Sequence, residues 1–390
     1  MRKFNLKVLL LLSLGHMTVD IYQGALPATL PFIKENLGLT YTMTGLIMIV
    51  SNFTSSILQP LFGFLSDKKE KAFLLPLGVF SAGLGYSLLS LPSHYFPVLA
   101  LVTISGLGVA SYHPEGYKTA AFFTGRRAAT GMSVFSVGGN LGFALGPIIA
   151  IWTISRFGFT SLPLVIIPSL LFTAAILVFR RAVALPEIME HARREAGETR
   201  AGGAYLSLIL TISAVIMRSW IQVGIMAYIP FYFIDVLKGD PVYAAKLVSL
   251  FLLGGTIGTL VGAPVADKWG HRFLLRASML LATLVFPLIF IVKGALLFVV
   301  LFVLGAILVS SFSVTIVMAQ KLLPKNLGIA SGLMTGFAIG AGGIGVTLLG
   351  VVADHYGVYA ALQSIGILPV VGFVLSMILK YPPEQEGQNA

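Results

Sequence analysis

Residues 63–69 read Gly-Phe-Leu-Ser-Asp-Lys-Lys, and residues 263–272 read Ala-Pro-Val-Ala-Asp-Lys-Trp-Gly-His-Arg. Each stretch follows a long apolar run and places an aspartate directly before a basic residue. The two aspartates, Asp67 and Asp267, are 200 positions apart. A repeat at this distance predicts that the chain consists of two similar halves.

A second pair of stretches supports the same division. The stretch 129–133 (Ala-Thr-Gly-Met-Ser) and the stretch 330–334 (Ala-Ser-Gly-Leu-Met) are each followed by closely spaced glycines. The segment 181–204, rich in Glu, Arg and Gly, lies between the halves. We therefore predict an N-terminal bundle over 1–180, a linker over 181–204 and a C-terminal bundle over 205–390.

Composition places most of the chain in lipid. Hydrophobic residues make up 57% of the 390 residues and charged residues only 11%, whereas soluble domains carry about 25% charged residues. Apolar runs of about 20 residues predict an all-α membrane protein with twelve transmembrane helices. Six helices in each half imply two bundles related by a pseudo-twofold axis along the membrane normal. The predicted spans are approximately 6–30, 42–65, 72–91, 96–118, 128–155, 159–180, 205–230, 243–266, 273–292, 295–318, 328–352 and 358–380.

The positive charges predict the topology. Of the 26 Lys and Arg residues, Arg218 falls inside a span, five lie on one side of the membrane and the remaining 20 lie on the side of both termini. Because Lys and Arg are enriched in cytoplasmic loops, both termini and the linker are expected in the cytoplasm. The net charge of +11 then follows from topology and does not indicate a nucleic-acid partner. The five opposite residues are Lys34, Arg156, Lys238, Lys246 and Lys293.

The first apolar run begins like a signal peptide. Basic residues precede it, but it is longer than a signal peptide and contains Asp20 and Pro27. We therefore expect it to remain as the first helix of the mature protein.

The repeated aspartates suggest a mechanical role. Each ends a span in a tight basic loop, where a carboxylate can accept hydrogen bonds from the N-terminus of a neighbouring helix or pair with an arginine. A single copy would favour an ordinary interfacial aspartate, but two copies at matching places favour a conformational latch. Pro147 is expected to bend the fifth span and shape a seal on the outer side. The predicted latch residues are Gly63, Asp67, Asp267, Arg272, Gly146 and Pro147.

Ionisable residues within the spans are rare. Among 15 acidic residues, Asp20 in the first span and Glu115 in the fourth lie within spans, and Arg218 lies well inside the seventh. A charge at this depth costs roughly 3 kcal/mol or more, so such groups usually face the bundle interior and serve function. Since the protonation of a buried carboxyl depends on its access to water and on nearby cations, we predict Asp20 as the proton-coupling group. A permanent structural ion pair is the alternative.

Three further residues are predicted to take part in proton coupling. Glu115 precedes Lys118 by three positions, so an interfacial ion pair is its alternative. His113 titrates near neutrality. His16 lies one helical turn before Asp20 on the same face, where it either tunes Asp20 or only hydrogen-bonds within the core.

Arg218 is the obvious partner for Asp20. Shifted by 200 positions it falls at position 18, near the pseudo-symmetric place of Asp20. It could pair with Asp20 at rest and bind an anionic substrate group when Asp20 is protonated, or it could form a purely structural salt bridge. Polar contacts to substrate are also expected, although each of these side chains could equally hydrogen-bond between helices. The candidates are Gln23, Gln59, Asn140, Gln222 and Tyr22.

The sequence lacks the motifs of catalysis. No hydrolase elbow, phosphate-binding loop or dinucleotide motif is present, so we expect neither an enzyme nor a cofactor. His16 with Asp20 and His113 with Glu115 resemble metal-binding pairs, but no third and fourth ligands are evident, so no metal is expected. With no cysteine, thiol chemistry is excluded.

Several motifs resemble one known family. The stretches 15–27 (Gly-His-Met-Thr-Val-Asp-Ile-Tyr-Gln-Gly-Ala-Leu-Pro), 112–118 (Tyr-His-Pro-Glu-Gly-Tyr-Lys) and 131–147, together with Gln59-Pro60, resemble the fosmidomycin-resistance family of major facilitator antiporters. The resemblance is dense over about 13–150. One departure is the loop after Asp67, which continues Lys-Lys-Glu-Lys and lacks the usual Gly-Arg.

The resemblance implies the major facilitator fold, a bacterial inner-membrane location, a monomer, and proton-driven efflux of drugs or related small molecules. Two alternatives stay open on the same scaffold. One is a proton-coupled importer of an organic anion, and the other is a membrane receptor without proton linkage.

Overall fold

The computed structural model describes residues 4–68, 72–179 and 201–381. Within these ranges the regular structure is helical, and no strand occurs. Of the predicted linker 181–204, only residues 201–204 are described, and they begin α10.

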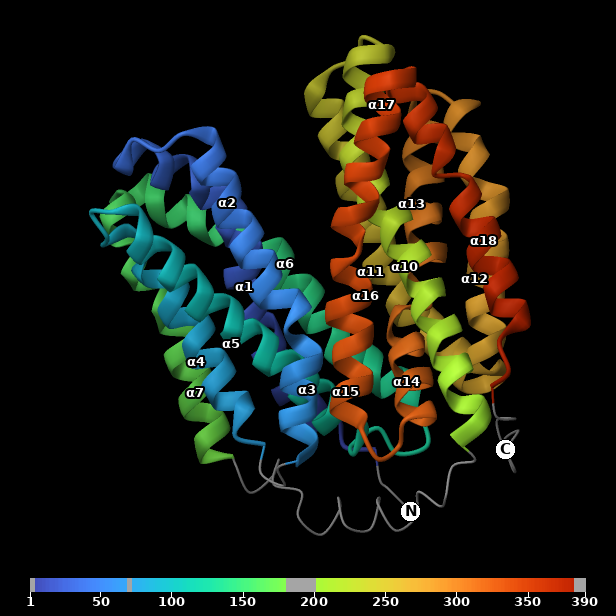
Figure 1. Cartoon of the computed structure of the whole chain (residues 1–390), viewed down its shortest axis with the longest axis horizontal. Helices are drawn as coiled ribbons and strands as arrows, with labels where there is room; N and C mark the ends of the chain where they lie inside the picture. The colour runs from blue at the N-terminus through green and yellow to red at the C-terminus, as the bar shows by residue number, and fades with distance from the viewer. Residues whose placement is uncertain (1–3, 69–71, 180–200, 382–390) are drawn as a thin grey trace. The chain divides into compact units, whose positions relative to one another are not determined.

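The first half contains six apolar helical spans, of which five are long enough to cross a membrane and the third, over 74–90, is shorter. Figure 1 shows them in blue to green. A π-helical turn interrupts the second span, and 3-10 turns end the third and begin the sixth. The spans are α1 (Leu6–Leu37); α2 (Tyr41–Asn52), η1 (Phe53–Ile57) and α3 (Gln59–Lys68); α4 (Leu74–Ser87) and η2 (Leu88–Ser90); α5 (Tyr95–Ala121); α6 (Ala128–Phe157); and η3 (Phe159–Ile166) with α7 (Ile167–Val178).

The second half contains six more spans within the described residues, so the predicted fold class is confirmed. Gly357, with φ of 87°, breaks the helix that joins the eleventh and twelfth spans. The spans are α10 (Ala201–Phe231) with η4 (Tyr232–Val236); α11 (Pro241–Trp269); α12 (His271–Val285) with η5 (Phe286–Phe290); α13 (Ala295–Val309) with α14 (Phe312–Leu322); α15 (Leu327–Gly332), η6 (Leu333–Phe337), α16 (Ala338–Gly340) and α17 (Gly342–Ser364) up to Gly357; and the rest of α17 with α18 (Ile367–Ile378).

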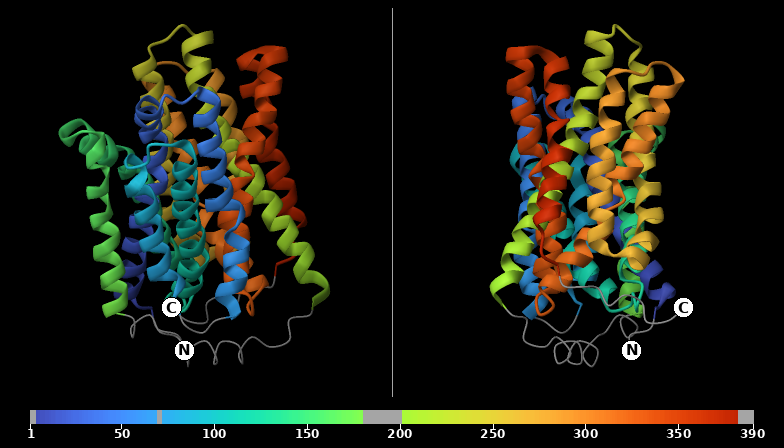
Figure 2. Two further views of the ribbon diagram at one scale, coloured as in Figure 1. Left: turned by 60° about the vertical axis from the view of Figure 1, so that its left-hand side comes forward. Right: turned by 90° about the vertical axis from the view of Figure 1, so that its right-hand side faces the viewer.

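The chain divides into two compact units whose boundary differs from the predicted bundles at one place. Unit 1 comprises Met1–Gly197 and Leu323–Phe337, and unit 2 comprises Glu198–Leu322 and Ala338–Ala390. The part of the eleventh span formed by α15 and η6 therefore belongs with unit 1, where α15 packs on α3 and α5 (Figures 1 and 2). We call residues 327–337 the α15–η6 segment.

The first helix is longer than the predicted span 6–30, because its end is set by its cap and not by its prolines. The Asn5 side chain accepts a hydrogen bond of 3.2 Å from the Val8 amide at the N-terminus. The C-terminal cap is Gly38 in the left-handed conformation. Pro27 and Pro31 both lie inside the helix.

Glycines bring α1 and α6 into backbone contact. A Cβ atom on Gly138, Gly142 or Gly146 would overlap the carbonyl oxygen of Ser13, Met17 or Ile21, respectively. The glycines and the carbonyls both recur every four residues, so one face of α6 lies along one face of α1. Small residues permit such close approach in lipid, where dispersion and not the hydrophobic effect holds helices together. This packing fixes the position of the polar residues on α1.

Replacing Gly142 by valine tests this packing. We expect Gly142→Val to cost about 1–3 kcal/mol of stability, because the new side chain must displace the α1 backbone at Met17. The measurement is the thermal unfolding midpoint of the detergent-purified protein. The control is Gly45→Val on α2, where a Cβ meets no atom within 4 Å. Equal midpoints for the two variants would contradict the close packing.

Candidate functional site

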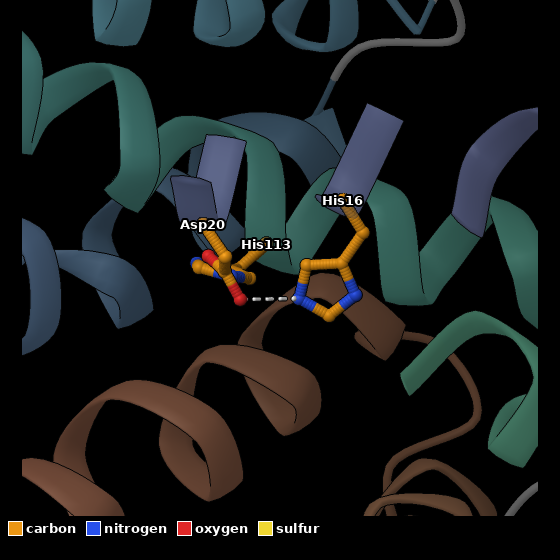
Figure 3. A group of neighbouring side chains, drawn as sticks. All are labelled: His16, Asp20 and His113. Carbon is orange, nitrogen blue, oxygen red and sulfur yellow. Dashed lines mark ion pairs between the residues drawn. The ribbon is translucent and has the colours of Figure 1, made fainter. Parts of the chain in front are cut away.

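Asp20 lies between two imidazoles inside unit 1. His16 Nε2 is 3.3 Å from Asp20 Oδ2, and His113 Nε2 is 3.0 Å from Asp20 Oδ1. The helices α1 and α5 supply these residues, and Figure 3 shows the side chains converging on one point. All three residues are at least nine-tenths buried. We call them the Asp20 cluster.

The hydrogen positions on His16 are set by its surroundings. His16 Nδ1 is 3.0 Å from the carbonyl oxygen of Phe135, which can only accept, so Nδ1 carries a hydrogen. Nε2 then faces Asp20 Oδ2 either as a second N–H or as a lone pair. In the first case Asp20 is ionised and His16 is an imidazolium; in the second case Asp20 is a carboxylic acid. A hydrogen on either Nε2 or Oδ2 would thus complete the contact between His16 and Asp20.

His113 is oriented by Gln59 at the end of the π-helical turn. Gln59 Nε2 is 3.4 Å from His113 Nδ1, and Gln59 Nε2 also donates to the Ser55 carbonyl oxygen at 2.8 Å. Because an amide nitrogen only donates, His113 Nδ1 accepts and His113 Nε2 carries the hydrogen. The contact of this Nε2 with Asp20 lacks hydrogen-bond geometry, so Asp20 Oδ1 is buried without a hydrogen bond among the described residues.

Gly139 on α6 leaves room for the Asp20 cluster. A Cβ at this position would lie 2.5 Å from His16 Nε2 and 2.6 Å from Asp20 Oδ2. The ring of Phe135 stacks on His16 with centroids 4.4 Å apart. The α6 helix thus borders the His16–Asp20 pair on one side: Phe135 packs on the His16 ring, and Gly139 leaves room for the pair.

The three side chains also have the composition of a metal site, because one ligand atom from each lies within 4.8 Å of the others. The sequence did not predict His113 as the third member of this group, because its position two residues before Glu115 suggested a pair with Glu115 and gave no sign of contact with Asp20. A histidine that ligates through Nε2 normally donates its Nδ1 hydrogen to an acceptor. The Gln59 amide requires the opposite arrangement at His113. In this arrangement the Gln59 amide therefore does not favour His113 as a metal ligand.

Glu115 does not join the Asp20 cluster. Its Oε1 is 3.4 Å from Lys118 Nζ, and both side chains are at most 2% exposed. Lys118 also donates to the Ser66 carbonyl oxygen at 2.5 Å and to the Ser66 hydroxyl at 2.9 Å. The pair is therefore buried, not interfacial, and it lies beside the end of α3. The predicted part of Glu115 in proton coupling stays a prediction.

Asp67 accepts hydrogen bonds from a helix N-terminus, as the sequence suggested. Its oxygens accept from the amides of Gly328 at 2.8 Å and Ile329 at 2.9 Å, at the start of α15. Gly63 permits the approach, because a Cβ there would overlap the Gly328 carbonyl. These contacts hold the α15–η6 segment on α3 within unit 1. Their function as a latch stays a prediction.

In unit 2, Arg218 on α10 is 3% exposed and donates through Nη1 to the hydroxyls of Ser311 and Thr315, both at 3.3 Å. Its guanidinium carbon lies 5.3 Å from the centroid of the Phe312 ring. The tenth span is broken at Ser310 and Ser311, so these contacts surround the first turn of α14. A positively charged side chain and a helix N-terminus thus lie together inside a membrane bundle.

The remaining candidates are spread over both units. Tyr22 is 1% exposed, and its hydroxyl donates to Val165 and accepts from the Ser169 amide, so it fastens α1 to the sixth span. In unit 2, Asp267 Oδ1 is 3.9 Å from His271 Nε2, and Arg272 donates to the Leu379 carbonyl at 3.5 Å.

Three of the predicted substrate contacts and one predicted latch residue, a proline, remain to be placed in the structure. Gln23 lines a small cavity and reaches the Ser55 hydroxyl at 3.5 Å. Asn140 and Gln222 are half-buried, and neither has a side-chain hydrogen bond with the residues that the structure describes. Pro147 lies inside α6.

Two contacts beside the candidate site were not predicted from the sequence. The Thr335 hydroxyl donates to Gln59 Oε1 at 2.7 Å. Ser66, whose carbonyl oxygen accepts a hydrogen bond from Lys118, was interpreted only as part of the 63–69 loop motif. Both are small hydroxyl residues in otherwise apolar spans, and such residues are too common in membrane helices to be singled out without the structure.

The arrangement of twelve spans with buried ionisable groups defines a multi-pass membrane transporter. The family model described as Major Facilitator Superfamily matches residues 12–284 and 237–390. The chain therefore belongs to the Major Facilitator Superfamily.

Two curated relatives cover nearly the whole chain. The uncharacterized MFS-type transporter YfnC of Bacillus subtilis (strain 168) is 32% identical over 388 residues, which is 97% of this chain and 93% of the relative. The fosmidomycin resistance protein of Escherichia coli (strain K12) is 30% identical over 370 residues, which is 93% of this chain and 90% of the relative. The predicted family resemblance is confirmed.

A solved structure shows the same fold. The transporter FucP in the outward conformation matches with a TM-score of 0.75 at 15% identity, covering 95% of this chain and 98% of that structure.

The buried pair of Lys118 and Glu115 can be tested by a double-mutant cycle. We expect Lys118→Met alone to cost about 3–5 kcal/mol, because it leaves a buried carboxylate without its cation. Adding Glu115→Gln removes that charge and should restore most of the loss. The measurement is the thermal unfolding midpoint of each purified variant. A double variant no more stable than Lys118→Met would show that the two side chains are not energetically paired.

Proposed function

We propose that the protein is a proton-coupled exporter of small amphipathic or anionic compounds, with Asp20 as the proton-binding group. The observation that carries this proposal is the buried carboxyl flanked by two imidazoles, with a contact between His16 and Asp20 that one proton would complete. Titratable groups inside membrane helices mark ion pathways. The relative named fosmidomycin resistance protein supports export of a drug-like molecule.

Coupling follows from competition between the proton and the substrate. When the cluster gives up its proton, Asp20 or the Asp20–His16 pair changes its charge and its hydrogen-bonding pattern. A substrate that binds better to one of these two forms displaces or retains the proton. Alternating access then turns the difference in affinity into exchange across the membrane.

Arg218 supplies the substrate contact in this proposal. The guanidinium and the first turn of α14 both favour negative charge, and half-helix N-termini inside transporters bind anionic substrate groups. Gln23, Asn140 and Gln222 are proposed as further polar contacts. Pairing of Arg218 with Asp20 at rest stays a prediction.

The latch is proposed to act at the ends of the helices. Asp67 fastens the start of α15, and its release would accompany opening on that side. Asp267 with Arg272 is the proposed counterpart in unit 2, and Gly146 with Pro147 the proposed outer seal. We place the protein in the bacterial inner membrane with both termini in the cytoplasm, and we expect a monomer.

Two other readings differ in what the protein would do with its ligand. A proton-coupled importer of an organic anion would use the same groups in the opposite direction. A membrane receptor would bind ligand without moving protons. The Asp20 cluster supports the two transport readings over the receptor.

Asp20→Asn tests the proton site. We expect wild-type protein in detergent to release protons when a panel of candidate drugs that includes fosmidomycin is added, and Asp20→Asn to bind ligand without release. The variant should fold and should still exchange substrate for substrate, because only the titrating group is lost. Asp354→Asn, at an exposed position, is the control and should release protons like wild type.

Each outcome of this experiment has a distinct meaning. Equal release from Asp20→Asn and wild type would remove Asp20 as the coupling group. If wild type binds a ligand without releasing protons, competition between the proton and the ligand is excluded, and symport or a receptor is favoured.

Arg218→Ala tests the anion contact. We expect anionic ligands to bind about 10–100-fold more weakly, the equivalent of losing a charged hydrogen bond, while neutral ligands change little. Binding isotherms for matched anionic and neutral members of the panel measure this. Arg156→Ala, which removes an exposed cation at the end of α6, is the control. Equal losses for both ligand classes would indicate a structural role instead.

A further inference from the structure

Gln59 contacts both the Asp20 cluster and the α15–η6 segment. Its Nε2 lies 3.4 Å from His113 Nδ1, and its Oε1 accepts from the Thr335 hydroxyl at 2.7 Å. Gln59 is 3% exposed and Thr335 is 8% exposed. The Gln59 amide thus contacts the Asp20 cluster through its nitrogen and the α15–η6 segment through its oxygen.

The orientation of this amide is fixed by a carbonyl. Gln59 Nε2 donates to the Ser55 carbonyl oxygen at 2.8 Å. If the amide turned over, Oε1 would face that carbonyl and two acceptors would meet. At Thr335 the same turn would exchange the accepting Oε1 for an N–H group, and the Thr335 hydroxyl would then donate to the Ser331 carbonyl. The orientation is therefore stable as long as His113 Nδ1 is a lone pair.

Protonation of His113 reverses this condition. Both ring nitrogens of an imidazolium are donors, so Nδ1–H would face the N–H of Gln59. The contact becomes repulsive, and it is relieved only when the amide turns or withdraws.

The charged and titratable groups around His113 are defined. They are Asp20 and His16 on α1, Glu115 and Lys118 on its own helix, and Asp67 on α3. The α15–η6 segment itself contains no titratable residue. Among the hydrogen bonds of the described residues, Gln59 joins His113 to the segment, and Asp67 contacts the first turn of the segment directly.

Thr335 can leave Gln59 at little cost. Its hydroxyl has one hydrogen, and it lies 2.8 Å from the Ser331 carbonyl as well as 2.7 Å from Gln59. When Gln59 turns, the hydroxyl keeps an acceptor within its own helix. The contact is therefore suited to open and close.

The α15–η6 segment is held on the second span at both ends. Asp67 binds its start, and Gln59 binds Thr335 near its end. Between them, a Cβ on Gly332 would lie 2.7 Å from the Gln59 carbonyl, so the backbones are in contact. The segment continues without a loop into α16 and α17, which belong to unit 2. Release of the segment would free the eleventh span to move as one element.

We propose that Gln59 is a positioning residue that transmits the protonation of His113 to the α15–η6 segment. A proton on His113 makes the Gln59 amide withdraw, which breaks its contact with Thr335 and loosens the segment from the second span. Loss of the proton restores the contact. The proposal rests on the proposed proton-binding role of the Asp20 cluster and adds the path by which that role reaches a helix.

The absence of cysteine in the sequence permits a direct measurement. Ser331, fully buried on α15, is replaced by cysteine as a reporter in the full-length protein in detergent. The alkylation rate by N-ethylmaleimide is measured at pH 8 and pH 6, each relative to the same protein unfolded in SDS at that pH. This ratio removes the effect of pH on the thiol itself.

We expect the relative rate in the Ser331→Cys background to rise about five- to tenfold from pH 8 to pH 6, the effect of losing roughly one hydrogen bond. Gln59→Leu and Thr335→Val should each give a high rate that no longer depends on pH. Thr347→Val, a threonine whose hydroxyl bonds within the same span at Gly343, is the matched control and should keep the pH dependence. His113→Ala should abolish it.

Two outcomes would overturn the proposal. One is a pH dependence that survives in Gln59→Leu and Thr335→Val, and the other is a pH-independent rate in the reporter background itself. Either result is compatible with ligand-driven proton release, so it would leave the proposed function standing. Loss of ligand-driven release in the otherwise unaltered protein would instead overturn the proposed function.

Discussion

A carboxyl group buried in a lipid-embedded bundle must have its charge and its hydrogen bonds satisfied by the protein alone. Asp20 meets this requirement through His16 on its own helix and His113 on α5. Each imidazole is in turn fixed by its other nitrogen, His16 by a carbonyl and His113 by an amide. The backbone contact of α1 with α6 makes the arrangement possible, since the missing side chain of Gly139 leaves room for the His16–Asp20 pair against α6.

At the end of the second span, buried polar groups are likewise satisfied by neighbouring residues. Asp67 binds the amides that begin α15, and Lys118 is satisfied by Glu115 and by Ser66, the neighbour of Asp67. A helix N-terminus and an ammonium group thus receive their acceptors from two adjacent residues of α3. The surroundings of Lys118 and of the first turn of α15 are therefore connected through two neighbouring residues of α3.

Apolar run length and repeat spacing were sufficient to predict twelve spans in two halves, because lipid allows a buried backbone few forms other than a helix. The contact of His16 with Asp20 was predictable from their spacing of four residues. His113 was not predictable as the second partner, since α1 and α5 meet only through tertiary packing. The length of α1 was underestimated because the span was predicted from an apolar run of about 20 residues, whereas the helix continues past Pro27 and Pro31 to its cap at Gly38. The attachment of the α15–η6 segment to unit 1 was likewise invisible, because the sequence repeat assigns it to the second half.

A permanent ion pair and a proton site differ in what surrounds the carboxylate. A permanent pair needs one fixed cation with good hydrogen-bond geometry, as Arg218 could have provided. Asp20 instead faces two imidazoles, of which one lacks hydrogen-bond geometry and the other has a nitrogen whose hydrogen depends on the state of Asp20. With one proton shared, the cluster is neutral overall, which a membrane interior favours. Without that proton, lone pairs of His16 and Asp20 face each other and one negative charge remains buried. The deprotonated form is therefore the one that requires a compensating partner, and a substrate that supplies a cation or a donor group at this position would take the place of the proton.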